Sequence, residues 1–149
     1  MVDMTRIAVT RRMPVPVGRV WAALADLASH TVWMKDAESI DFVTAQRAGV
    51  GTRMKVKTLV GPFRTIDEME VVRWDEGRAI GVVHTGLVKG QGTFTIAEAS
   101  PGDTDVRWDE ELSFPWWLGG PFTAMFARPV LAAIWRGNLR RLEESLSSP

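Results

Sequence analysis

Several residue types that would point to a definite chemistry are missing from this chain. Its 149 residues include no cysteine, so disulfides, thiolate catalysis and cysteine-ligated metal sites are excluded. Tyrosine is also missing, and with it the phenol as a proton donor or oxyanion clamp. The 18 basic and 18 acidic residues balance, so no net field favours nucleic acid or an acidic partner. The composition therefore predicts no nucleic-acid binding.

Long apolar runs are missing as well. No stretch approaches the roughly 20 apolar residues of a membrane-spanning helix, and the N-terminus has no basic start followed by an apolar run. We therefore expect a cytoplasmic protein without stable membrane insertion. The two histidines lie far apart and lack the spacing of a metal site, and no glycine-rich phosphate loop opens a helix. The sequence thus predicts neither a metal nor a cofactor.

What the chain does have is one continuous α+β pattern, which predicts a single domain over residues 1–149. Residues 5–13 alternate as a strand, and short helices are expected up to about residue 25 and over residues 27–34. Period-two alternation predicts further strands near residues 40–44, 52–60, 63–72, 78–85, 90–98 and 104–114. A long amphipathic helix follows at about residues 121–146. Only this helix is long enough to cover the apolar face of the sheet, so we expect a curved antiparallel sheet of about six or seven strands wrapped around it.

Strand pairing predicts which side chains face the interior. A hairpin closed by the turn at residues 61–62 places Val56 opposite Asp67, and in a later pair Phe94 lies opposite Trp108. The inward positions and the apolar helical residues would line a pocket for an apolar small molecule. The predicted ligand-binding residues are Trp33, Met54, Val56, Met69, Phe94, Trp108, Trp117, Phe122, Met125 and Phe126.

Two carboxylates are candidate catalytic groups. Asp67 and Glu110 fall in the inward register, and Gly92 opposite Glu110 leaves space beside its side chain. A carboxylate that faces an apolar cavity has a raised pKa, which suits a general acid or base. One β-bulge would instead turn either side chain to water. The sequence leaves both orientations open.

His84 is the third candidate, and its orientation depends on the turn after Arg73. A four-residue turn over residues 74–77 places His84 opposite Asp67 inside the cavity. A three-residue turn with Gly77 in the left-handed conformation turns His84 outward. The glycine favours the three-residue turn, so we expect His84 to face solvent.

The Trp-Trp-Leu-Gly-Gly segment at residues 116–120 has two interpretations. Glycines permit motion and tryptophans stack on rings, so the segment is a candidate lid at the pocket entrance. It would equally serve to anchor the last helix or to contact a second copy. Both a monomer and a homodimer are compatible with the sequence.

Several segments carry a resemblance to a known family. They are PVPVGRVWAALAD (residues 14–26) with Trp33-Met34, and residues 49–57, 71–82, 102–114 and 136–146. Together they resemble the polyketide cyclase/dehydrase and lipid-transport family, which belongs to the superfamily of START domains and the major birch pollen allergen. The resemblance implies a helix-grip fold around an internal hydrophobic cavity. Members bind lipids, sterols, polyketides or hormones, and some are aromatases or cyclases; some of these use a pocket tyrosine, which this chain lacks.

Three functions follow as hypotheses. The first is binding of an apolar, ring-containing small molecule, and a cavity lined only by apolar atoms would favour it. The second is a cyclase, aromatase or dehydratase, favoured by an inward, desolvated carboxylate near a second polar group. The third is a protein-interaction module, favoured by a filled core and a large exposed apolar patch.

Overall fold

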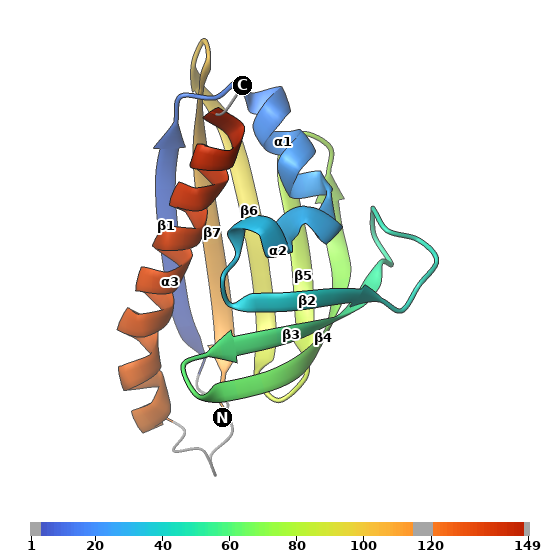
Figure 1. Ribbon diagram of the computed structural model, residues 1–149, viewed down its shortest axis with the longest axis vertical. Coiled ribbons are helices and arrows are strands. Elements are labelled where there is room, and N and C mark those ends of the chain that lie inside the picture. The colour runs from blue at the N-terminus through green and yellow to red at the C-terminus, as the bar shows by residue number, and fades with distance from the viewer. Residues whose placement is uncertain (1–3, 115–120, 148–149) are drawn as a thin grey trace.

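Seven antiparallel strands form one curved sheet in the computed structural model, which describes residues 4–114 and 121–147. The strands are β1 (Thr5–Met13), β2 (Ala37–Phe42), β3 (Arg53–Val60), β4 (Phe63–Asp75), β5 (Ala79–Thr85), β6 (Lys89–Ser100) and β7 (Asp103–Ser113). Their order in the sheet is β1-β7-β6-β5-β4-β3-β2. In Figure 1, β2 and β3 cross the direction of β5, β6 and β7, and β4 bends from one direction to the other, which shows how strongly the sheet is curved. The predicted architecture is confirmed.

The helices lie on one side of this sheet. They are α1 (Val17–Ala25), the 3-10 turn η1 (Leu27–Ser29), α2 (His30–Trp33) and α3 (Pro121–Ser147). Figure 1 shows α3 running beside β1, with α1 and α2 in front of β5 and β6. Among the described residues, no helix has the length and apolar character needed to cross a membrane.

The predicted strand register holds through the centre of the sheet. Val56 pairs with Asp67 across the β3–β4 hairpin, and Phe94 pairs with Trp108 across β6 and β7. Because paired residues of antiparallel strands project to the same face, these matches place the predicted inward side chains together. The register therefore identifies which residues of these strands point to the inner face of the sheet.

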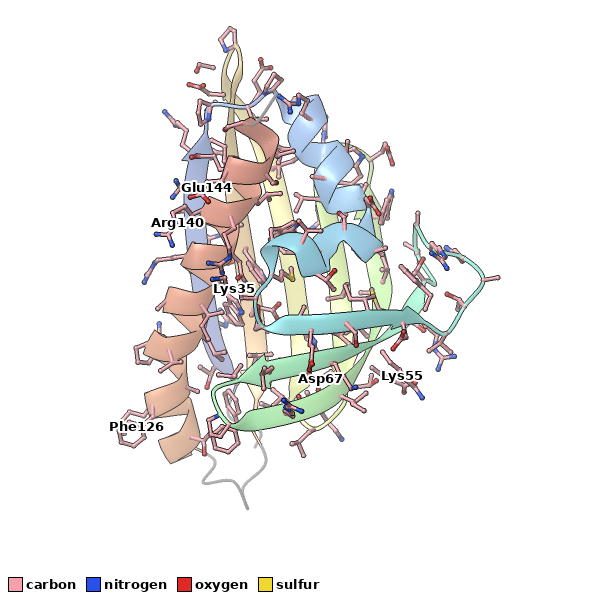
Figure 2. The ribbon with its side chains drawn as sticks, in the orientation of Figure 1. Lys35, Lys55, Asp67, Phe126, Arg140 and Glu144 are labelled. Carbon is pink, nitrogen blue, oxygen red and sulfur yellow. The ribbon has the colours of Figure 1, made fainter. Side chains whose placement is uncertain are left out.

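A buried asparagine fixes α3 to the start of β2. Asn138 is fully buried, and its Nδ2 donates to Asp36 Oδ1 at 2.7 Å. The backbone N–H of Lys35 donates to Asn138 Oδ1 at 3.1 Å, and Trp135 Nε1 donates to Asp36 Oδ2 at 3.3 Å. Lys35 is labelled in Figure 2 between α3 and the start of β2. Hydrogen-bonded polar groups of this kind hold the C-terminal half of α3 in one position.

The N-terminal half of α3 does not line the interior as predicted. Met125 and Phe126 are 63% and 71% exposed, and Val130 is 50% exposed. In Figure 2, Phe126 projects from the lower end of α3 away from the sheet. Among the described side chains of α3, the buried ones begin at Ala132, because a helix of 27 residues is about 40 Å long and reaches beyond the part that packs on the sheet and α2. The assignment of Met125 and Phe126 to a pocket wall is therefore wrong.

Candidate functional site

Three titratable side chains meet on the inner face of the sheet. We call Asp67 of β4, His84 of β5 and Glu110 of β7 the polar cluster. Asp67 and Glu110 are 8% and 6% exposed, so both carboxylates, whose orientation the sequence left open, point inward and are desolvated. His84 Nε2 lies 3.0 Å from Glu110 Oε2, and only 12% of the His84 side chain is exposed. The cluster thus joins all three candidate catalytic residues.

The prediction that His84 faces solvent is wrong, although the predicted turn length is right. The turn between Asp75 and Ala79 has three residues, and Gly77 adopts a φ of 76°. A bulge between Val71 and Arg73 then shifts the register by one residue. His84 therefore pairs with the inward residue Met69, not with the outward position that the turn alone would give.

The glycines of β6 allow His84 and Glu110 to meet. Strand β6 lies between their strands, and its inward positions opposite them are Gly90 and Gly92. A Cβ on Gly92 would overlap the Glu110 carboxylate. The absence of a side chain at these two positions leaves the space through which the imidazole reaches the carboxylate.

Glu110 is held from both sides. Its Oε2 accepts the hydrogen bond from His84, and its Oε1 accepts one from Trp108 Nε1 at 3.0 Å. Since Trp108 precedes Glu110 by two residues on β7, both side chains lie on the same face. Hydrogen bonds to a carboxylate from two such donors fix its orientation.

The surroundings raise the pKa of both His84 and Asp67. Burial by itself lowers the pKa of His84, but the hydrogen bond to Glu110 and the negative charges of Glu110 and Asp67 together outweigh it, so the pKa is raised. The pKa of Asp67 is raised because burial disfavours its charge, against the opposing effects of His84, Thr65 and Thr58. Raised values on neighbouring acid and base groups are typical of functional sites.

Aromatic rings pack beside the polar cluster. We call His30, Trp33, Phe94, Trp108 and Trp135 the aromatic cluster. The Phe94 and Trp108 ring centroids are 4.7 Å apart, and Trp108 stacks on Trp135 at 5.0 Å. The indole N–H of Trp33 is buried and has no hydrogen-bond partner among the described residues. A buried donor without a partner is costly, and a ligand acceptor would remove that cost.

His30 has a structural position within the aromatic cluster. Its Nε2 lies 2.8 Å from the carbonyl oxygen of Leu24, and the side chain is buried. Burial lowers the pKa of His30 to about 4, although the bond to Leu24 opposes this. The ring is therefore neutral near pH 7 and acts as part of the apolar wall.

The remaining predicted lining residues fall into three groups. Trp33, Met54, Val56 and Trp108 are buried in the core, and Met69 and Phe94 are half-buried on the inner face. Trp117 and the side chain of Phe122 lie outside the described residues, as does the candidate lid at residues 116–120. Met69, which pairs with His84, and Val82, two residues before His84 on β5, are both only half-buried, so the inner face is not sealed at this end.

Two surface hollows lie elsewhere and include no residue of the polar cluster. One, of about 980 Å³, is lined by the turn at residues 75–78 and by residues 95–98 of β6. The other, of about 350 Å³, lies between Ile7 of β1 and Pro129 of α3. Neither hollow is lined by a buried polar side chain, whereas the inner face carries buried polar groups beside aromatic rings, so we place the site on the inner face. Within residues 4–114 and 121–147, no three acidic or histidine side chains are arranged to hold a metal ion.

Comparison with known proteins agrees with this geometry. Residues 4–147 match the family model described as polyketide cyclase/dehydrase and lipid transport. The chain belongs to this family. The helix-grip architecture that the resemblance implied, with α3 against a curved seven-stranded sheet, is the one that the chain shows. No curated protein sequence matches the chain.

Solved structures with the same fold come from several organisms. A protein of Thermus thermophilus is 21% identical, with a TM-score of 0.79 over 96% of this chain and 99% of that one. A START superfamily protein of Mycobacterium smegmatis is 11% identical, with a TM-score of 0.80 over 97% of each chain. An aromatase/cyclase of a Streptomyces species is 16% identical, with a TM-score of 0.75 over 97% of this chain and 94% of that one. At these identities the similarity shows the fold alone.

Proposed function

We propose that the chain binds a ring-bearing apolar small molecule that also carries a polar group, on the inner face of the sheet. The observation that supports this best is the aromatic cluster beside the His84–Glu110 pair, whose two polar atoms lie 3.0 Å apart with little of either side chain exposed. Ligand pockets typically combine apolar and aromatic walls with a few placed polar groups. Phe94 and Trp108 supply the wall, and the unpartnered indole N–H of Trp33 supplies a donor.

A fluorescence titration tests this function. The neutral probe 6-propionyl-2-dimethylaminonaphthalene has two fused rings and a ketone, and its emission shifts to the blue in an apolar site. We expect saturable binding to the native chain and weaker binding to Val82→Phe, because Val82 is half-buried and pairs with Gly92 beside Glu110.

The control is Phe126→Ser on the exposed part of α3. This variant should bind the probe as the native chain does. Binding that survives Val82→Phe but disappears in Phe126→Ser would place the site on α3 and overturn the proposal.

The His84–Glu110 pair favours one second function, acid–base catalysis of the dehydratase type. If Nε2–H of neutral His84 donates to Glu110, the other ring nitrogen, Nδ1, is left free to accept a proton. In the dehydration of a β-hydroxy ketone, the imidazole takes the proton from the carbon next to the carbonyl and returns a proton to the departing hydroxyl. A double bond forms, water leaves, and the imidazole ends neutral.

The substrate 4-hydroxy-4-phenylbutan-2-one tests this second function, because its dehydration product absorbs in the near ultraviolet. Turnover that falls at least about a hundredfold in His84→Gln, in line with the usual contribution of a general base, would support catalysis. No turnover above buffer would leave binding as the function.

A further inference from the structure

The charge on the inner face points to the kind of polar group that a ligand carries there. We propose that this face selects ring-bearing ligands with a positively charged amine and disfavours those with a carboxylate or phosphate. The inference rests on the proposed function, since it concerns the same site. It names the ligand class that the polar cluster accepts.

Strand parity keeps lysine and arginine away from this face. In the described strands, Arg11 is the only such side chain in the inward register, and it is bound to Glu143 of α3 at 3.1 Å. The basic residues of the neighbouring strands point outward and are exposed, namely Arg53, Lys55, Lys57 and Arg107. The described strands therefore place no lysine or arginine beside the polar cluster for an anionic head group to meet.

The polar cluster contains two carboxylates and a single imidazole, so with both carboxylates ionised it carries one more negative charge than His84 can balance. His84 is hydrogen-bonded to Glu110, and the imidazolium form balances that carboxylate. Asp67 has no ion-pair partner among the described residues. A monocation beside Asp67 would neutralise the set, whereas a ligand anion would add to the negative charge in a poorly solvated place.

Asp67 also has an acceptor that nothing in the described chain uses. Thr58 and Thr65 both donate to its Oδ2, at 3.4 Å and 3.3 Å. Its Oδ1 is buried and has no hydrogen-bond partner among the described residues. Gly86 follows the last residue of β5, and a Cβ added at this glycine would lie only 2.6 Å from Oδ1. An ammonium group is a donor with a positive charge, and so it meets both needs of this carboxylate.

The inner face around Asp67 is partly open, which is what a ligand needs to approach it. Thr58, Thr65 and Met69 are half-buried, and they surround Asp67 on β3 and β4. Figure 2 labels Asp67 between these two strands. A ring that packs against the aromatic cluster would leave its substituent to extend toward this part of the sheet.

Isothermal titration calorimetry with three matched probes at pH 7.5 tests the inference. The probes are 1-naphthylmethylamine, 1-naphthylmethanol and 1-naphthoate, which share the ring and differ in head-group charge. We expect the amine to bind at least about tenfold more tightly than the carboxylate, with the alcohol between them, since tenfold is a small share of one unit-charge interaction at low dielectric.

The isosteric variant Asp67→Asn assigns the selectivity, and Asp109→Asn is its control. Asp109 lies next to Glu110 on β7 but pairs with the exposed Arg107 on the outer face. The ratio of amine to carboxylate affinity should fall at least about threefold in Asp67→Asn and stay unchanged in Asp109→Asn. Both variants should bind the alcohol about as tightly as the native chain does.

Three other outcomes would each overturn one part of the proposal. Carboxylate binding that equals or exceeds amine binding overturns the charge inference but leaves the proposed function in place. An unchanged ratio in Asp67→Asn overturns the role of Asp67. Failure of all three probes to bind overturns the proposed function, and the charge inference with it.

Discussion

His84 Nε2 lies 3.0 Å from Glu110 Oε2, although strand β6 separates the strands that carry them. The contact exists because the inward positions of β6 between them are glycines, Gly90 and Gly92. Three strands therefore build one polar pair: two supply the side chains, and the third supplies the space.

Substitution of Gly92 by alanine should break this pair. The new Cβ would overlap the Glu110 carboxylate and push it away from His84. Overpacking of this kind costs about 1–3 kcal/mol, which urea denaturation would show as a loss in the free energy of unfolding. The control is Gly18→Ala in α1, where a Cβ meets nothing within 4 Å; a helical alanine there should stabilise by about 0.5–1 kcal/mol. Equal stability of Gly92→Ala and the native chain would contradict the contact.

The pKa of His84, measured by NMR titration of its imidazole, should lie above the ordinary value of a histidine. Glu110→Gln should lower this pKa, since it removes both a charge and a hydrogen-bond acceptor. Because the folded pKa is raised, the pair stabilises the fold fully below the unfolded pKa, and this stabilisation is lost as pH rises through the folded pKa. In Glu110→Gln this loss with rising pH should be smaller. A His84 pKa that is the same in both proteins would show that Glu110 does not act on the ring.

His30 should behave in the opposite way. Its pKa is lowered to about 4 because the ring is buried, so its NMR signals should stay those of a neutral ring until the pH approaches that value. For a histidine with a lowered pKa, stability is present above the unfolded pKa and is lost as pH falls through the folded one. Urea midpoints should therefore drop between about pH 6.5 and pH 4. Titration of His30 near 6.5 would mean that the ring is not buried.

Asn138→Ala should destabilise the fold strongly for a residue on a helix. The change removes the hydrogen bonds to Asp36 and Lys35 and leaves two part-buried polar groups each short of one partner, which should cost about 1–3 kcal/mol in all. Arg140→Ala is the control, because its contact with Glu144 at 3.8 Å is exposed and worth at most about 0.5 kcal/mol. Figure 2 shows Arg140 and Glu144 together on the outer side of α3. A similar loss in both variants would exclude the asparagine contact as the anchor of α3.

Much of the fold was predictable because it depends on parity and on turn residues. The pairing of Val56 with Asp67 follows from the tight turn at residues 61–62, and the pairing of Phe94 with Trp108 follows from alternation along β6 and β7. Alternation predicts side-chain direction from the number of residues along a strand, so the prediction fails beyond a bulge, where the strand contains one extra residue. The orientation of His84 was mispredicted for that reason. The length of the turn was predicted correctly, but no residue pattern indicates the bulge between Val71 and Arg73.

Other parts of the site depend on extents and contacts that periodicity does not contain. Helical spacing places Met125 and Phe126 on the apolar face of the helix, but it does not indicate how far along the helix the sheet packs against that face. Asn138 was passed over, although one signal was present. It lies three residues after Trp135 and four before Leu142, so it is a polar residue on the buried face of α3.

The most direct test of ligand binding on the inner face is the two-dimensional ¹H–¹⁵N spectrum of the tryptophan indoles during titration with 1-naphthylmethanol. We expect the indole N–H signals of Trp33 and Trp108 to move, since the Trp33 N–H lacks a partner among the described residues and Trp108 lies beside Glu110. The signals of Trp21 and Trp74, whose N–H groups both donate to Glu76, should stay in place. Movement of Trp21 and Trp74 with Trp33 and Trp108 unchanged would contradict the proposed site.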